Sequence, residues 1–248
     1  MVIPANIAQA MRVSPMVVEM KNSGSGAVAR IEVQNLNSAD LPFETLITRI
    51  DFDDEGNVVE TPADPKDFLV FPGQGILGAD KRQVVRVQWV GPPIETSRGY
   101  YLSVNQIPVE LGPRESSATG AQVQVVYHMK VLITVAPPKA APEVSVVSAI
   151  PTMVELPKAE DGTEQASVPG VEVRVKNTGN RHAMMAGVVW TIEGKDLQGE
   201  RLVVQLSLED LNRYVGVGYL AALNGDRSFK LPTGKAFGSG PIKVKFSQ

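Results

Sequence analysis

The chain has 248 residues, with 24 basic and 27 acidic side chains and no cysteine. The balance of charge excludes a strongly basic nucleic-acid-binding protein. The lack of cysteine excludes disulfides, cysteine-ligated zinc, iron–sulfur clusters and thiol catalysis. Only His128 and His182 could serve a histidine metal centre, and no run of 18 apolar residues predicts insertion into a membrane. Aromatic residues make up 6% of the chain, whereas about 35 valines favour strands.

The first ten residues contain a pattern typical of an export signal. Ala8-Gln9-Ala10 has the small-x-small form that a signal peptidase recognises, and the mildly apolar residues 2–7 precede it. One interpretation is that residues 1–10 are the remnant of a signal peptide and that the mature protein starts near Met11. The other interpretation is that these small residues occur there by chance.

The first half of the chain reads as a series of short strands. Stretches of alternating apolar and polar residues are separated by clusters of glycine, proline, asparagine and aspartate, which form turns. We expect seven strands, near residues 12–20, 27–35, 43–52, 67–71, 83–90, 99–108 and 121–135. Strands of this length and spacing predict a β-sandwich.

A proline-rich segment divides the chain. Residues 136–142 hold three prolines, which interrupt a sheet and favour a stiff, extended linker. We therefore expect an N-terminal domain at 11–136 and a C-terminal domain at 143–248.

The C-terminal part has the same character as the first half. Residues 171–175, 187–193 and 241–246 read as strands, and residues 206–214 as a short helical turn. The sequence IEVQN at 31–35 has a counterpart in VRVKN at 173–177. Together the two halves predict an all-β protein with two tandem immunoglobulin-like β-sandwich domains.

Two glycine-rich segments fit the spacing of dinucleotide-binding turns. Residues 73–78 match GxGxxG and residues 216–221 match GxGxxA. A dinucleotide site also needs a preceding strand and a following helix. Residues 83–90 read as another strand, so glycine-rich loops are the better interpretation.

One acidic turn resembles the start of a calcium loop. Asp51, Asp53 and Glu55 have suitable spacing, but Pro62 stands where a bidentate glutamate is needed. The sequence also contains no GxSxG motif. We therefore expect no metal, no cofactor, no catalytic residues and no enzymatic activity.

The segment 120–135 is unusual for its length. Its alternation continues for about fifteen residues, whereas a typical strand has five or six. Its first half projects one row of side chains to a single face: Ala121, Val123, Val125, Tyr127 and Met129. Lys130 lies on the other face and on its own reads as a solvated lysine that protects an edge strand from aggregation. A strand that overhangs its sandwich could add itself to another sheet.

Four segments carry a resemblance to a known family. They are residues 13–19 (VSPMVVE), 77–87 (LGADKRQVVRV), 98–108 (RGYYLSVNQIP) and 127–137, which ends at the proline linker. Their order and spacing resemble the PapD-like periplasmic pilus-assembly chaperones of the chaperone–usher pathway. The C-terminal part is similar mainly in residues 177–180 and 241–246.

The resemblance implies a fold, partners and a site. Members of this family have two immunoglobulin-like domains, bind pilus subunits that lack a strand, and deliver them to an outer-membrane usher. The donor strand that completes the subunit would consist of Ala121, Val123, Val125, Tyr127 and Met129. Lys130 stands where the family has a lysine that holds the terminal carboxylate of the subunit.

One position departs from the family pattern. The family's arginine, the second cation of the anchor, belongs where this chain has Val17. Arg12 lies five residues earlier and would replace it only in a different register. The departure suggests a divergent branch, such as the chaperones of spore-coat-like or archaic pili.

We therefore expect a periplasmic, non-catalytic chaperone for pilus or fimbrial subunits. The alternative is a tandem immunoglobulin-like adhesion or carbohydrate-binding module, which predicts exposed aromatic residues clustered in loops. A third class, a small β-rich hydrolase, requires convergent acid and base residues that the sequence does not display.

Overall fold

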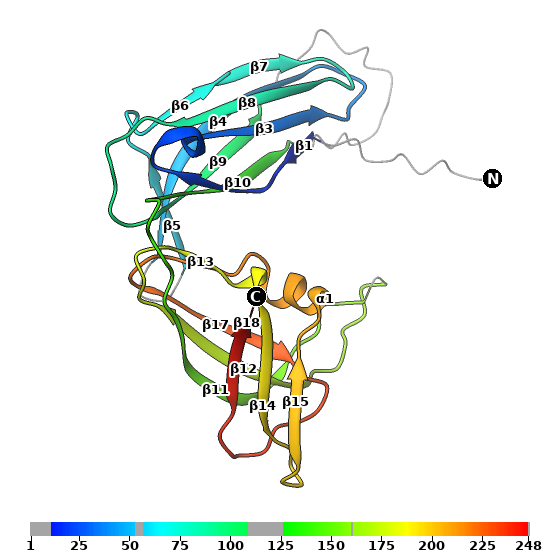
Figure 1. Ribbon diagram of the computed structural model, residues 1–248. Helices are drawn as coiled ribbons and strands as arrows, with labels where there is room; N and C mark the ends of the chain where they lie inside the picture. The colour runs from blue at the N-terminus through cyan, green and yellow to red at the C-terminus, as the bar shows by residue number, and fades with distance from the viewer. Residues whose placement is uncertain (1–10, 53–56, 109–125, 160, 248) are drawn as a thin grey trace, which may run out of the picture. The chain divides into compact units, whose positions relative to one another are not determined.

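The computed structural model describes residues 11–52, 57–108, 126–159 and 161–247 (Figure 1). The chain divides into two compact units, Met1–Pro138 (unit 1) and Lys139–Gln248 (unit 2). In the described part of the chain, no helix has the length and apolarity needed to cross a membrane.

The described residues of unit 1 form two sheets and one short helical turn, η1 (Gly24–Ala27). The four-stranded sheet has the order β1-β3-β8-β6 and the six-stranded sheet has the order β2-β10-β9-β4-β5, with β7 also paired to β4. The strands are β1 (Met11–Ser14), β2 (Val17–Lys21), β3 (Val28–Asn35), β4 (Leu41–Phe52), β5 (Val58–Pro62), β6 (Phe68–Phe71), β7 (Gln74–Leu77), β8 (Arg82–Trp89), β9 (Arg98–Gln106) and β10 (His128–Ala136).

The core of unit 1 lies between these two sheets. In β1, β3 and β8, alternate residues point inward, so the period-two pattern of the sequence becomes a buried face and a more exposed face. Ile31 and Val87 come from the four-stranded sheet, and Leu102 and Ile133 from the other; all four are fully buried in one apolar cluster. Burial of this kind stabilises the fold by about 1.5–3 kcal/mol for each large apolar side chain.

The prediction of one continuous strand at 12–20 is wrong. The chain forms β1 in the four-stranded sheet, passes a cis peptide bond between Ser14 and Pro15, and continues as β2 in the six-stranded sheet. Proline has no backbone N–H to donate to a ladder, so it suits the point where the chain leaves one sheet for the other.

Two further differences from the expected strands concern unit 1. Two strands, β5 and β7, were not expected. Strand β10 begins at His128, so residues 126 and 127 do not belong to it, and residues 121–125 lie outside the described residues. The first glycine-rich segment contains β7 and is not followed by a helix, which excludes the dinucleotide-binding turn there.

Unit 2 has a sandwich of smaller sheets with the orders β11-β12-β17 and β15-β14-β18, and a two-stranded sheet of β13 and β16. Trp190 and Phe229 pack edge to face at 5.5 Å in its core. The strands are β11 (Val144–Val154), β12 (Val168–Asn177), β13 (Ala183–Met184), β14 (Val189–Lys195), β15 (Arg201–Gln205), β16 (Tyr219–Leu220), β17 (Gly225–Pro232) and β18 (Lys243–Ser247). The helical turns are η2 (Met185–Gly187), α1 (Leu208–Asp210) and η3 (Leu211–Val215).

The helical turn expected at 206–214 is present as α1 and η3. Ser207 and Asp210 form a capping box, in which the Ser207 side chain accepts from the Asp210 amide and the Asp210 side chain accepts from the Ser207 amide. The second glycine-rich segment follows this turn and leads into β16, a strand, so it too lacks the helix of a dinucleotide site.

Each of the two units has a buried asparagine at the end of a central strand. Asn35 ends β3 and Asn177 ends β12, and both are fully buried. The Asn35 Nδ2 donates to the carbonyl oxygens of Leu77 and Gly78, and the Asn177 Nδ2 to that of Ala221. Each asparagine ties its strand end to a distant loop, which accounts for the sequence likeness between 31–35 and 173–177.

Candidate functional site

The candidate site lies where β10 changes neighbours. From Leu132 to Val135, β10 lies between β9 and the parallel strand β2. From His128 to Val131, its only strand partner among the described residues is β9. The change arises because the chain crosses from β1 to β2 at Pro15, so that β2 begins only at Val17.

Between His128 and Val131, every second residue of β10 directs its backbone N–H and C=O groups away from β9. The Gln106 amide on β9 donates to the Tyr127 carbonyl, and on the opposite edge the Leu132 amide donates to the Met16 carbonyl, each over 2.9 Å. Successive residues in a strand direct their N–H and C=O groups to alternate edges. The backbone groups of His128 and Lys130 therefore face away from β9, toward an edge that can accept another strand.

The side chains of the segment divide between the two faces of the sheet. Tyr127 and Met129 are half-buried and pack against the core of unit 1. His128 and Lys130 are exposed on the other face. The His128 Nδ1 lies 3.1 Å from the Asn105 Oδ1 on β9, which holds the imidazole beside the open edge.

Lys130 is engaged by a carboxylate of its own unit. Its Nζ lies 2.5 Å from the Glu60 Oε1 on β5 and 5.6 Å from the ring centroid of Tyr101 on β9. The Thr48 hydroxyl donates to the other carboxylate oxygen of Glu60 over 2.8 Å. The hydrogen bond from Lys130, followed by that from Thr48, lowers the pKa of Glu60 below its ordinary value of 4.5.

The Lys130 ammonium group thus binds a carboxylate of its own unit. A charge-assisted hydrogen bond is stronger than a neutral one, and the Tyr101 ring adds a favourable face for the cation. About half of the Lys130 side chain is exposed, so an incoming carboxylate can approach it from solvent.

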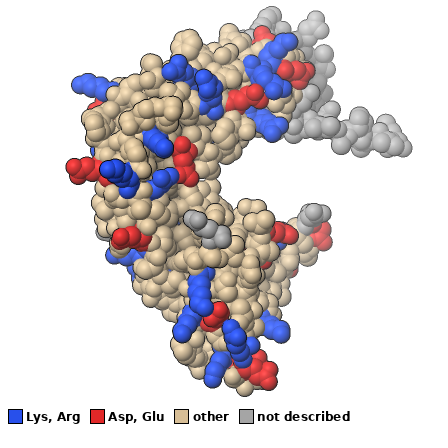
Figure 2. Space-filling model, viewed as in Figure 1, with Lys and Arg blue, Asp and Glu red and all other residues tan. Residues whose placement is uncertain are grey.

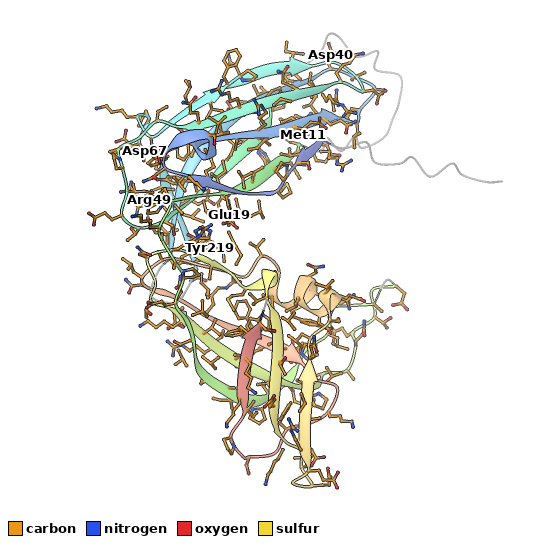
Figure 3. All side chains as sticks on the ribbon, in the orientation of Figure 1. Met11, Glu19, Asp40, Arg49, Asp67 and Tyr219 are labelled. Atoms are coloured by element: carbon orange, nitrogen blue, oxygen red, sulfur yellow. The ribbon has the colours of Figure 1, made fainter. Side chains whose placement is uncertain are left out.

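The structure does not bring the two candidate cations together. Arg12 lies on β1 opposite Gln34 in the four-stranded sheet, whereas Lys130 lies on β10 in the six-stranded sheet. Val17 pairs with Leu132, two residues from Lys130, and brings no charge to that place. Figure 3 labels Met11 on β1 and Glu19 on β2, the strands on either side of the crossing.

The donor residues fall into two groups. Tyr127 and Met129 are described and lie in or beside β10. Ala121, Val123 and Val125 lie outside the described residues.

Glu60 and Tyr101 were not expected from the sequence as neighbours of Lys130. Tyr101 stands on a predicted strand, and the turn residues in the sequence at 53–57 predict a chain reversal before Glu60. What brings them to Lys130 is the strand order β10-β9-β4-β5, and local patterns carry no signal for that order. No group of three or more metal-ligating side chains occurs in the part of the chain that the structure describes.

Comparison with known proteins supports the fold. No protein-family model matches the sequence, and no curated protein matches it. Solved structures do match. The class 5 fimbriae chaperone CfaA has a TM-score of 0.55 and 14% identity over 96% of this chain and 92% of its own.

Two further solved structures are similar over nearly the whole length. The structure of the Salmonella enterica SafA pilin with the SafB chaperone contains a chain with a TM-score of 0.51 and 13% identity, over 96% of this chain and 97% of that one. An archaic chaperone–tip adhesion complex, CsuC–CsuE of Acinetobacter baumannii, contains one with a TM-score of 0.50 and 11% identity, again over 96% and 97%. The chain therefore has the two-domain, immunoglobulin-like fold of the fimbrial chaperones, as the sequence predicts.

Proposed function

We propose that this protein is a periplasmic chaperone that binds fimbrial or pilus subunits by lending them a strand and passes them to an outer-membrane usher. The observation that carries the proposal is the edge of β10 at His128–Val131, which no strand of the described residues covers, next to an exposed lysine, in a fold shared with fimbrial chaperones. A strand added there would take main-chain hydrogen bonds from His128 and Lys130.

Two kinds of contact would supply affinity and register. The row Ala121, Val123, Val125, Tyr127 and Met129 would fill the groove of a subunit that lacks a strand, with about 1.5–3 kcal/mol for each large apolar side chain that becomes buried. Lys130 would bind the terminal carboxylate of the subunit. A one-residue slip moves every side chain of a strand to the other face, so a fixed anchor at Lys130 would set the register.

The distribution of aromatic side chains argues against a carbohydrate-binding module. Such a module needs aromatic faces in contact with solvent. Among the described residues, only Phe71 is an exposed aromatic, while Trp89, Tyr100 and Trp190 are buried.

The test is co-expression with a fimbrial subunit from the same cell. The subunit should co-purify with the wild-type protein and be lost with Lys130→Ala, because the carboxylate anchor is removed. Lys66→Ala, a substitution of another exposed lysine of unit 1, should leave the yield of bound partner unchanged. Pull-down yields and circular dichroism of the free variants measure the two effects.

The possible outcomes distinguish the role of Lys130 as the carboxylate anchor from the chaperone function itself. If no strand-deficient pilus protein co-purifies with the wild-type chain, the chaperone function is wrong. If Lys130→Ala folds normally and binds its partner as well as the wild type does, the function stands but the anchor lies elsewhere.

A further inference from the structure

The outer face of the four-stranded sheet of unit 1 carries a concentration of arginine. We call it the arginine face. Four arginines point away from the core, because the alternate residues of the same strands point into it. They are Arg12, Arg30, Arg82 and Arg86. The rest of the face is made up by Ser14, Val28, Glu32, Gln34, Leu69, Phe71, Val84 and Gln88. Among these residues, Glu32 is the only carboxylate.

The register of the sheet aligns these residues in rows. Arg12, Gln34 and Arg82 are partners across β1, β3 and β8. A second row places Arg30 directly opposite Arg86, followed by Phe71 on β6. Two like charges in directly opposite positions repel each other across an antiparallel pair.

The single carboxylate does not neutralise this face. Glu32 lies 3.5 Å from Arg82. The Arg86 guanidinium donates to Gln88, a neutral side chain, over 2.9 Å. Within the described part of the chain, no ion pair involves Arg12, Arg30 or Arg86. The guanidinium groups of Arg30 and Arg86 thus have N–H donors that could bind a carboxylate. The negative charge of that carboxylate would also reduce the repulsion between the two arginines.

Exposed apolar side chains lie beside the arginines. Phe71 is 72% exposed, Leu69 57% and Val84 45%, although all three belong to regular strands. Phe71 and Leu69 stand on β6, at the edge of the sheet, and Arg86 is the direct neighbour of Phe71. Figure 2 shows several basic side chains on the visible side of this unit.

We infer that the arginine face is a docking surface for an acidic segment of a partner protein that presents carboxylates to Arg30 and Arg86 and an apolar side chain to Phe71. Guanidinium groups bind carboxylates through two parallel hydrogen bonds, and aromatic and arginine side chains are typical of interface anchors. The inference is separate from the donor edge of β10, which belongs to the other sheet.

The chemistry of the face favours a protein segment over an anionic membrane. Binding to a membrane surface strengthens with the apolar area that enters the lipid and with the basic residues around that area. Here the strongly exposed apolar side chains form a narrow strip on β6 and β8, and the arginines stand in rows across the strands. Carboxylates spaced along an extended chain can match such rows.

The test uses a defined probe. We would measure binding of the full-length protein to a fluorescent peptide of alternating glutamate and serine with a central phenylalanine, and to the same peptide with glutamine for glutamate. The acidic peptide should bind, the neutral one should not, and added salt should weaken binding. Arg30→Gln with Arg86→Gln should weaken binding at least tenfold, and Phe71→Ala severalfold.

Matched controls keep the test specific to this face. Arg201→Gln with Lys230→Gln removes the same charge from exposed positions of unit 2 and should change the dissociation constant less than twofold. Thermal unfolding should show that the Arg30 and Arg86 variant folds at least as stably as the wild type, because a repulsive pair has been removed.

Either of two results would overturn the inference. One is equal weakening by the unit 1 and unit 2 double variants, which would mean that only net charge matters. The other is binding to phosphatidylglycerol vesicles, lost in the Arg30 and Arg86 variant, without binding to the acidic peptide. That result would assign the face to a lipid surface.

Discussion

Lys130 is already paired with a carboxylate in the free protein, and this has consequences for binding. Glu60 lies 2.5 Å from its Nζ and is itself held by Thr48. The Lys130 ammonium group has three N–H donors, so a carboxylate that a partner brings must either share this group with Glu60 or displace Glu60. In the proposed function, Glu60 therefore competes with the pilus subunit and weakens its binding.

Replacing this competitor gives a prediction at the residue scale. Glu60→Gln should strengthen binding of the pilus subunit, by a factor of roughly ten if about 1.4 kcal/mol of competition is removed. Titration of the purified variant with a peptide that has the last residues of that partner would measure the dissociation constant. Asp40→Asn, a change at an exposed carboxylate of unit 1, serves as the control and should have no effect. Weaker binding by Glu60→Gln would show that Glu60 positions Lys130 for the partner instead of competing with it.

The same ion pair should make stability depend on pH. The pKa of Glu60 is lower in the folded protein than its ordinary value of 4.5, chiefly because of the hydrogen bond from Lys130. A lowered pKa means that Glu60 stabilises the fold above pH 4.5 and that this contribution is lost as the pH falls through the lowered value. The melting temperature of the wild type should therefore exceed that of Glu60→Gln at pH 7, and the difference should shrink below pH 4.5. A difference independent of pH would contradict this.

At the level of a single strand, the two halves of β10 differ. The second half lies in the core between two strands, whereas the first half has one edge that no strand of the described residues covers. Val131, Ile133 and Val135 are fully buried, and β2 covers the edge from Leu132 onward. The transition is set by the place where the neighbouring chain changes sheets. The alternation of residues along β10 does not reveal it, since alternation specifies faces and not edges.

The orientation of the backbone can be tested with proline. His128→Pro removes an N–H that faces the open edge, so it should weaken binding of the pilus subunit while the fold remains intact. Met129→Pro removes an N–H that faces β9, so it should destabilise unit 1. Pull-down assays together with thermal unfolding distinguish the two variants. Full binding by a folded His128→Pro variant would show that the partner strand does not pair there.

Across the molecule as a whole, each unit holds the end of a central strand in place through the hydrogen bonds of a buried asparagine. Asn35 and Asn177 each satisfy backbone groups of distant loops from a fully buried position. A buried backbone group that loses its partner costs about 1–3 kcal/mol. Asn35→Ala and Asn177→Ala should therefore each lower the free energy of unfolding by about 2–4 kcal/mol, because more than one such group is affected. Urea denaturation measures both, and a loss below ~1 kcal/mol would mean that water replaces the asparagine.

Local sequence patterns were sufficient to predict the class of fold. Alternation of apolar and polar residues specifies which face of a strand is buried, and turn residues specify where strands end, so the two sandwiches could be predicted. The correspondence of Asn35 with Asn177 was also visible in two similar pentapeptides, IEVQN and VRVKN. The single strand expected at 12–20 is wrong because the chain passes from one sheet to the other at Pro15 without interrupting the apolar pattern.

Which residues meet depends on how the strands assemble. The strand order brings Glu60 from β5 to Lys130 on β10, and it places Arg12 in the other sheet, among three further arginines. Neither outcome follows from local sequence, because the order of strands depends on connections and cores that involve the whole unit. Charge and periodicity give the composition of each face, and the register between strands determines which charges lie side by side.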